Sequence, residues 1–259
     1  EQEYEEVEIR VGEEERGFSL EFWARAPEYY SIAIRSPSGE YTPRIVTRFT
    51  SSQVLDFVFE ETKIYVDYRT VVQGEGDFLI LIRFQNPTLG IWTLRVYNSL
   101  YINGNYNMWL PMYGFISPDT VFLRPSPDTT LTIPATTGNV IVASAYNHVN
   151  GGIYINSSRG YPLSNIIKPD LAAPGVNVYG PLVGNRFGRM TGTSVAAAHM
   201  AGAAALLLEW ALVRDNREIL TTGDAIAFFI RGASRKPGVV YPNREWGYGT
   251  LDVYSDKNR

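Results

Sequence analysis

The stretch Met190-Thr191-Gly192-Thr193-Ser194-Val195-Ala196-Ala197-Ala198-His199-Met200-Ala201-Gly202 is the most informative part of this chain. A Gly-Thr-Ser turn opens an alanine-rich segment, and that composition predicts a helix from about Ser194 to Val213. A serine in this position lies at the positive end of the helix dipole, with its hydroxyl outside the helix. An acyl-transfer nucleophile benefits from the position, because the dipole and the backbone N–H groups stabilise an oxyanion formed beside it.

Ser194 also has a simpler interpretation. Serine is a favoured N-cap residue, and in an isolated Gly-Thr-Ser sequence capping of the helix is the more frequent role. The choice between cap and nucleophile therefore depends on the rest of the chain.

Several segments resemble the subtilisin-like serine proteases, the subtilase family. Gly192–Gly202 is similar to the family's nucleophile segment, with Ala198 where that segment usually has proline. The resemblance covers about residues 126–259, and it implies that Ser194 is the nucleophile and that Thr193 and Gly192 belong to the oxyanion turn. The other matching segments, in chain order, are Thr132–Thr136, Asn139–Asn147, Ser157–Gly160, Lys168–Gly175 and Trp246–Gly249.

Three parts of the family's catalytic machinery have no counterpart here. A Ser-His-Asp mechanism needs a base for the serine proton and a carboxylate that orients the base, and subtilisins carry them in the order Asp, His, Ser. No segment resembles the family's Asp-Thr-Gly, His-Gly-Thr-His or Ala-Gly-Asn motifs. His199 follows Ser194 by five positions and points about 140° away around the helix, and the resemblance implies a structural role for it. His148, in the turn-forming segment 147–152, is the other histidine.

We therefore expect the catalytic Asp and His and the oxyanion Asn on an upstream N-terminal fragment, which would be a partner of this chain. The chain is then either a proteolytic product that stays docked to that fragment or a truncated form produced alone. An isolated C-terminal half would expose core surface and tend to aggregate, which favours the docked product.

Composition bounds the remaining possibilities. The 259 residues are 45% hydrophobic, which suffices for a sizeable core and predicts one large or two medium domains. Cysteine is absent, so disulfides and thiolate metal sites are excluded. No spacing resembles a calcium loop, and we predict no metal and no cofactor. We also predict no membrane span, because His199, Gly202 and Glu209 interrupt the longest apolar segment, 195–213.

The charge balance and the spacing of apolar residues along the chain both change near Pro125. Residues 1–125 carry 18 acidic and 11 basic side chains, whereas residues 126–259 carry 9 acidic and 12 basic ones. The acidic balance of the first half argues against a nucleic-acid partner. These changes predict two domains, a β-sandwich over 1–125 and the C-terminal part of a subtilase catalytic domain over 126–259.

The first half is predicted to be all β, in short runs rich in aromatic and β-branched residues that turn residues separate. So many short strands predict a sandwich, most simply a jelly roll. The expected strands are Glu6–Val11, Gly17–Arg25, Tyr29–Arg35, Arg44–Thr50, Val54–Glu60, Lys63–Tyr68, Asp77–Phe84 and Ile91–Tyr97.

The second half is predicted to have α/β packing. Its expected elements are a strand over Asn139–Ala145, the helix from Ser194 to Val213, and a further helix over roughly 224–233 for which Thr222-Gly223-Asp224 would be the cap.

The order of these parts narrows the resemblance to one group of subtilases. A long β insertion before the strand that contains Ile141 is similar to the Csp group, the clostridial germination proteases, in which a jelly-roll domain interrupts the catalytic domain. Ser36–Glu40, Met108–Pro111 and Tyr241–Gly247 also look like that group. This resemblance implies a bacterial protein that is extracellular or spore-associated.

The function expected from the sequence is that of a serine endopeptidase fragment that hydrolyses peptide bonds of a protein or peptide substrate through an acyl-enzyme on Ser194. The chain alone should be inactive. Two alternatives remain: an inactive pseudoprotease that serves as a scaffold or sensor, and a carbohydrate-binding β-sandwich with a vestigial protease portion. Aromatic side chains clustered on one exposed face of residues 1–125 would favour the second alternative, and inward-pointing ones would weaken it.

Overall fold

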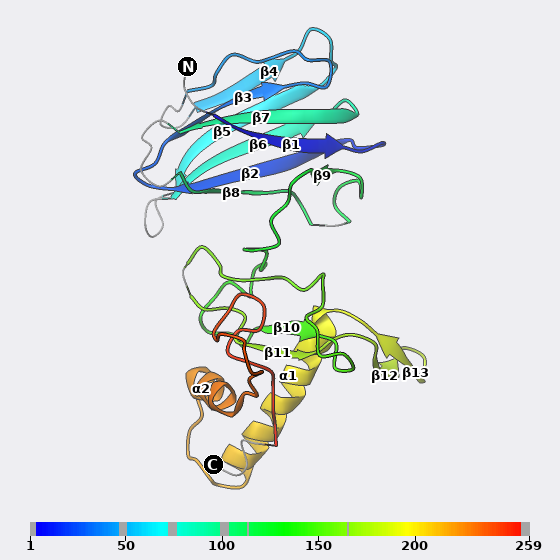
Figure 1. The fold of residues 1–259 in the computed structure, drawn as a ribbon, viewed down its shortest axis with the longest axis vertical. Helices are drawn as coiled ribbons and strands as arrows, with labels where there is room; N and C mark the ends of the chain where they lie inside the picture. The colour runs from blue at the N-terminus through cyan, green and yellow to red at the C-terminus, as the bar shows by residue number, and fades with distance from the viewer. Residues whose placement is uncertain are drawn as a thin grey trace. The chain divides into compact units, whose positions relative to one another are not determined.

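The chain divides into two compact units, Glu1–Pro125 and Ser126–Arg259, in a computed structural model (Figure 1). The structure describes residues 4–46, 51–71, 77–98, 104–112, 114–164 and 166–254. The division falls where the sequence changes from an acidic to a basic balance.

The first unit consists of two antiparallel sheets that enclose one hydrophobic core. The four-stranded sheet has the order β3-β7-β1-β9, with strands Tyr30–Arg35, Gly90–Asn98, Glu5–Val11 and Val121–Phe122. The five-stranded sheet has the order β4-β5-β6-β2-β8, with strands Ser51–Asp56, Lys63–Val71, Asp77–Gln85, Gly17–Arg25 and Tyr106–Trp109.

Alternation along the strands explains why the two sheets pack face to face. In β2 the side chains of Phe18, Leu20 and Phe22 are buried, while those between them are more exposed. Successive side chains of a strand point to opposite faces, so a period of two gives each sheet one apolar face. Trp92 of the other sheet lies in the same core and is fully buried. The structure thus shows the two-layer arrangement, while the jelly-roll topology stays a prediction.

Two of the expected strands are placed differently. Of Arg44–Thr50, the described residues 44–46 form no strand, and only Ile45 makes an isolated bridge, to Ile32; residues 47–50 lie outside the described residues. β4 spans Ser51–Asp56 instead of Val54–Glu60, since its register is set by pairing with β5. A β-rich run of sequence does not specify which of its residues find a hydrogen-bonding partner.

The second unit is built on a short parallel pair of strands. β10, Ala143–Tyr146, pairs with β11, Leu171–Pro174, and helix α1, Thr193–Leu208, packs against both. The predicted strand Asn139–Ala145 was too long at its start, because Ile141 and Val142 precede the paired residues. The remaining elements are the hairpin strands β12, Val178–Leu182, and β13, Arg186–Met190, the π-helical turn η1, Glu209–Val213, and helix α2, Thr222–Gly232.

Helix α1 is apolar on all sides but is covered on only one. Ala196, Met200, Ala203 and Leu207 recur every three or four residues and are buried, which places them on one face. Leu206 and Leu208 on other faces are about half exposed, at 53% and 45%. A helix that is apolar all round normally lies in a core. The faces of α1 that carry Leu206 and Leu208 are not covered by the described residues.

One helical segment bears on the expected absence of a membrane span, which stays a prediction. The residues counted as interruptions, His199, Gly202 and Glu209, all lie within one continuous helical segment, Thr193–Val213. By length and composition alone this segment could cross a membrane, and 28% of its most apolar window is buried. Core helices of globular proteins meet the same criterion, and the packing of α1 on β10 and β11 favours that interpretation.

A buried ion pair lies at the start of β11. The Lys168 ammonium donates to both carboxylate oxygens of Asp170, at 2.9 and 2.7 Å, and to the carbonyl of Val140 at 2.7 Å. The same carboxylate accepts a hydrogen bond from the amide of Val142 at 2.7 Å. Burial raises the pKa of Asp170, while the hydrogen bonds from Lys168 and Val142 oppose that shift. The pair therefore joins the chain before β10 to the chain before β11.

We predict that Lys168→Met lowers the free energy of unfolding by about 3–5 kcal/mol at neutral pH, because it leaves the Asp170 carboxylate buried without its cation. The loss should shrink as the pH falls toward the ordinary carboxyl pKa, because a protonated Asp170 needs no counterion. Urea unfolding across that pH range measures both effects. Lys63→Met, which breaks an exposed pair with Asp56, is the control and should change little; equal losses in both variants would contradict the prediction.

Helix α2 begins with a reciprocal cap one residue earlier than expected. The N-cap is Thr221, not a residue of 222–224: its hydroxyl accepts from the amide of Asp224, and the Asp224 carboxylate accepts from the Thr221 amide. This is a capping box. Hydrogen bonds from the side chain and backbone of Thr221 hold the pKa of Asp224 below its ordinary value.

We predict that acid weakens this end of α2. A carboxyl whose pKa is lowered in the folded state contributes stability above the unfolded-state pKa and loses it as the pH falls through the lower, folded-state pKa. Amide hydrogen exchange of α2, corrected for intrinsic rates, should therefore accelerate as the pH is lowered through the acid range. Asp224→Asn should remove that acid step, and a step that persists in this variant would rule out Asp224 as its origin.

Candidate active site

The turn before α1 is held from two sides. The amide of Gly192 donates to the carbonyl of Gly175 at 2.8 Å, just after β11, and the amide of Asn177 donates to the Thr191 hydroxyl at 2.9 Å. Gly192 has φ 153° and ψ 165°, a backbone conformation that favours glycine. The start of α1 is therefore fixed relative to the end of the parallel strands.

Ser194 does not cap this helix. The N-cap residue is Gly192, no side-chain cap hydrogen bond is present, and Ser194 is the second residue of α1. Its side chain is exposed, and its hydroxyl makes no hydrogen bond with the described residues. The capping interpretation of Ser194 is thus excluded by the local geometry, and the hydroxyl is left available for chemistry.

The backbone around Ser194 suits a negative charge. The amides of Val195 and Ala196 both bond to the Gly192 carbonyl, at 3.1 and 3.4 Å. The two amides before them, of Thr193 and Ser194, belong to the first turn of a helix, whose N–H groups have no intrahelical acceptor. The helix dipole adds its positive end at the same place. Gly192 is the N-cap and Thr193 the first residue of α1, and their part in an oxyanion turn stays a prediction.

No hydrogen bond among the described residues joins either histidine to Ser194. His199 Nδ1 bonds to the carbonyl of Val195 at 3.0 Å, one helical turn back, so that nitrogen is engaged by its own helix. His148 lies in the exposed turn after β10, and its ring has no hydrogen bond within the described part of the chain. The described residues also contain no group of three His, Cys, Asp or Glu side chains that could hold a metal ion.

Small residues bring the strands close to the nucleophile turn. A Cβ added to Gly175 would lie 2.6 Å from the Ala145 Cβ and 2.9 Å from the Gly192 carbonyl oxygen. Ala145, Ala173 and Ala196 form a small fully buried cluster at the same contact. Only glycine and alanine allow α1 to begin at this distance from the strands.

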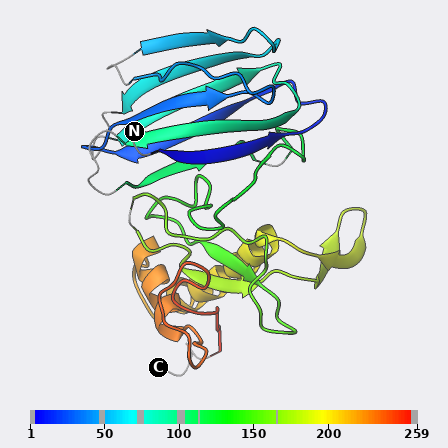
Figure 2. The same cartoon turned by 45° about the horizontal axis from the view of Figure 1, so that its top comes forward.

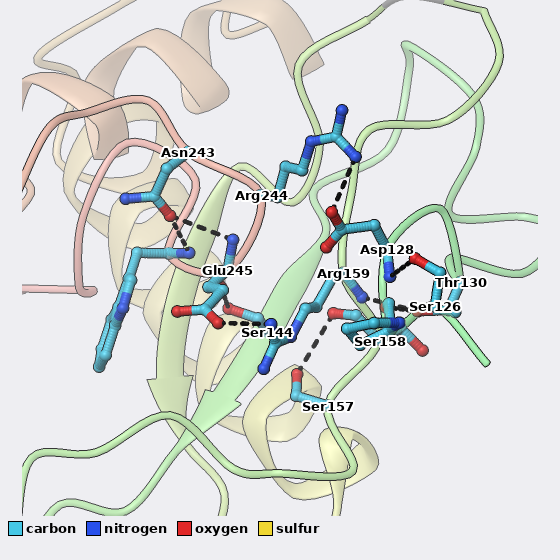
Figure 3. Close-up of polar contacts among 12 residues, drawn as sticks. Ser126, Asp128, Thr130, Ser144, Ser157, Ser158, Arg159, Asn243, Arg244 and Glu245 are labelled. Atoms are coloured by element: carbon cyan, nitrogen blue, oxygen red, sulfur yellow. Dashed lines mark hydrogen bonds and ion pairs between the residues drawn. The ribbon is translucent and has the colours of Figure 1, made fainter. Parts of the chain in front are cut away.

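A polar network joins three of the predicted motif segments (Figure 3). Glu245 pairs with Arg159 at 2.8 Å, and its backbone carbonyl accepts from the Ser144 hydroxyl of β10 at 2.6 Å. Arg244 pairs with Asp128 at 3.0 Å. The network ties the segments around 128, 159 and 244 to the strand pair that carries the site. Sequence reasoning identified the segments that contain Ser144, Arg159 and Glu245, but neither Asp128 nor these pairings, which no local pattern reports.

The fold and the site together define a class of protein. An unengaged serine hydroxyl at the N-terminus of a helix, beside the ends of parallel strands, is the arrangement of an α/β serine hydrolase. Comparison with known proteins identifies the family within this class. The Subtilase family of peptidases matches residues 103–249, which are more than half of the chain, and the chain belongs to that family.

Two curated proteases are similar to parts of the chain. The subtilisin of Bacillus pumilus is 37% identical over 106 residues, which make up 39% of this chain and 36% of that protein. The thermophilic serine proteinase of Bacillus sp. strain AK1 is 48% identical over 50 residues, 19% of this chain and 12% of that protein.

A solved structure matches nearly the whole chain. The CspB protease of Clostridium perfringens superposes with a TM-score of 0.91 at 30% sequence identity, covering 99% of this chain and 54% of the CspB chain. This similarity agrees with the resemblance inferred from the sequence motifs. The chain thus spans about half the length of the CspB protease and about a third of the subtilisin.

We predict that Gly175→Ala destabilises the second unit by about 1–3 kcal/mol, because the added methyl group must displace Ala145 or the Gly192 carbonyl. Thermal and urea unfolding measure the loss. Gly138→Ala is the matched control, since a Cβ there meets no atom within 4 Å. The same stability for the two variants would refute the close-contact argument.

Proposed function

We propose that this chain is the nucleophile-bearing portion of a serine endopeptidase, with Ser194 as the nucleophile. The observation that carries the proposal is the placement of Ser194: it lies in the first turn of α1, exposed, with a hydroxyl that neither caps the helix nor bonds to another described residue. Membership of the subtilase family supports the reaction type.

The chemistry assigns one part of the mechanism to this chain. The Ser194 hydroxyl attacks the peptide carbonyl and loses its proton to a base, which then protonates the leaving amine; water hydrolyses the acyl-enzyme. The Ser194 amide, with the Thr193 hydroxyl, helps to hold the oxyanion. The described residues supply no base. The base, its orienting carboxylate and the oxyanion asparagine come, in this proposal, from polypeptide upstream of these residues.

Two features of the second unit support an upstream partner. Helix α1 is covered on only one face although it is apolar all round. In addition, β10 and β11 form a two-stranded parallel sheet, whereas parallel sheets in α/β proteins are normally larger and covered on both faces. An upstream portion that adds strands to this sheet and packs on α1 would satisfy both, and the CspB protease has length to spare outside the aligned region.

The finer assignments extend from the same similarity. We infer that the sandwich of residues 1–125 is a jelly-roll insertion in a Csp-type protease and that residues 126–259 complete the catalytic domain. In that assignment the protein is bacterial, is extracellular or spore-associated, and acts in spore germination. The 30% identity with the CspB protease supports this assignment.

The carbohydrate-binding alternative is weakened by the position of the aromatic rings. The large rings of the sandwich, among them Phe22, Tyr30 and Trp92, are buried in its core. On the outer face Tyr4 and Tyr41 are 44% exposed, but the guanidinium of Arg95 lies over both rings at 4.5 Å. A sugar would have to displace this cation to stack there. The pseudoprotease alternative depends on the upstream Asp and His.

The test is reconstitution. The 259-residue chain alone should show no peptide hydrolysis above background and slow labelling by a fluorophosphonate probe, because the proposal places the base for the Ser194 proton on the upstream polypeptide. Co-production with the upstream polypeptide should yield a stable complex that cleaves a fluorogenic peptide. Ser194→Ala should abolish cleavage and leave the complex intact.

Each outcome decides between the functions. Rapid labelling of the chain alone would overturn the division of the catalytic residues and point to His148. A stable complex that never turns over, although the upstream Asp and His are present, would establish the pseudoprotease. Cleavage that survives Ser194→Ala would exclude Ser194 as the nucleophile.

A further inference from the structure

The hairpin formed by β12 and β13 carries an exposed aromatic surface. Tyr179 and Phe187 are 67% and 64% exposed, and their rings stack with centroids 5.9 Å apart and an interplanar angle of 20°. The hairpin stands away from β10, β11 and α1 in both views (Figure 1, Figure 2). Two stacked rings in open solvent contribute little to a core, which suggests that they meet another molecule.

The strand register places the rings on a single face. Tyr179 pairs with Arg189, and Pro181 pairs with Phe187. Because paired residues share a face and alternate residues of a strand do so too, these four side chains form one surface, which we call the aromatic face.

The opposite face of the hairpin is partly covered by its own residues, although Leu182 is 38% exposed. Leu182 lies against Gly188, where an added Cβ would be 2.6 Å from Leu182 Cδ1, and Met190 lies against Gly180 in the same way, at 2.9 Å. The glycines thus let the apolar side chains of that face lie flat on the backbone. The aromatic face has no such cover among the described residues, so the two faces differ in what they leave open.

The charge of this region is of one sign. The sequence from Leu171 to Leu208 contains no acidic residue, while the hairpin contributes Arg186 and Arg189. Neither arginine forms an ion pair with a described residue; Arg189 donates to the Asn177 carbonyl at 3.0 Å, and Arg186 to the Val183 carbonyl at 3.4 Å. Their positive charge is uncompensated and suits a partner with carboxylates.

The hairpin is joined to the turn before α1 by a short connection and by hydrogen bonds. β13 ends at Met190, and the chain reaches Ser194 after three further residues. The hydrogen bond between Asn177 and Thr191 closes the base of the hairpin, and the bond between Gly192 and Gly175 begins beside it. A molecule held on the aromatic face is therefore held at a fixed place relative to Ser194.

We propose that the aromatic face binds the substrate polypeptide outside the scissile bond, at a segment that carries a large aromatic or aliphatic side chain next to carboxylates. The proposal rests on the proposed function, because continuity with the Ser194 turn is what selects a peptide substrate as the occupant. Stacking on Tyr179 and Phe187 would supply the affinity, and Arg189 the preference for acidic residues. An anionic lipid surface and a nucleic acid are the competing occupants.

The kinetic test uses the chain co-produced with the upstream polypeptide. A fluorogenic peptide rich in phenylalanine and glutamate is compared with a short activated ester that has no residues beyond the reacting bond. Tyr179→Ala/Phe187→Ala should lower kcat/KM for the peptide by roughly tenfold, mainly through KM, and leave the ester rate unchanged. Val240→Ala is the matched control and should change neither rate, because Val240 lies outside the hairpin and is 83% exposed.

The outcomes separate the two proposals. Equal losses for peptide and ester would mean damage to the nucleophile turn, and no loss for either would mean no binding role; each result overturns the proposed face. If the wild-type complex cleaves neither substrate, the proposed function fails. Binding measurements then test the aromatic face separately. For that purpose the Ser194→Ala complex is titrated with the labelled peptide, with a copy carrying glutamine for glutamate, with phosphatidylglycerol vesicles and with an oligonucleotide.

The binding result expected is tighter association with the glutamate peptide than with its glutamine copy, lost in the Tyr179→Ala/Phe187→Ala variant. Binding of vesicles or oligonucleotide that depends on these rings, with no binding of the peptide, would assign the face to that other occupant. Peptide binding that the double variant leaves unchanged would place the peptide elsewhere.

Discussion

The hydrogen bond between the Gly192 amide and the Gly175 carbonyl is the contact on which the second unit depends. It joins the end of β11 to the start of α1, and it can form only because residue 175 has no side chain to strike Ala145. This contact fixes the position of the first turn of α1, and with it the helix dipole, the free amides and the Ser194 hydroxyl, relative to the end of β11. Catalysis by positioning requires such rigidity, because a nucleophile that is misplaced by about 1 Å loses much of its advantage.

The second unit stabilises its strands with charge and leaves its helix uncovered. Lys168 and Asp170 hold the chain ahead of β10 and β11 together by a buried pair. The closing segment is tied to β10 by the hydrogen bond from Ser144 to the Glu245 carbonyl, and Arg244 pairs with Asp128. These polar contacts specify a single arrangement of short strands whose apolar contacts are few. The exposed apolar face of α1 has the opposite character, since it offers area without specific partners, as expected of a surface that another part of a protein is to cover.

The first unit, by comparison, buries its apolar surface within itself. Its two sheets bury one continuous core, and its outer face is closed by stacked pairs such as Arg95 on Tyr41 and Arg44 on Tyr97. Its described residues contain no group of three His, Cys, Asp or Glu side chains that could hold a metal ion. The proposed nucleophile, Ser194, lies in the second unit, at the start of α1.

Local pattern determined much of this protein. The alternation in Gly17–Arg25 predicted β2 with the bounds that it has, and the alanine run predicted a helix that begins within one residue of its observed start and ends at Val213. The predicted helix start placed Ser194 at its N-terminus, because a helix start is specified by neighbouring residues. Its role as nucleophile was implied by the resemblance to the subtilases. Only the tertiary structure decided which residues of 44–60 pair, that Gly192 rather than Ser194 caps α1, that Glu245 meets Arg159, and that Tyr179 stacks on Phe187 in the open. Periodicity reports which face of an element is buried, whereas a contact between distant residues depends on the path of the whole chain, which no local window of sequence contains.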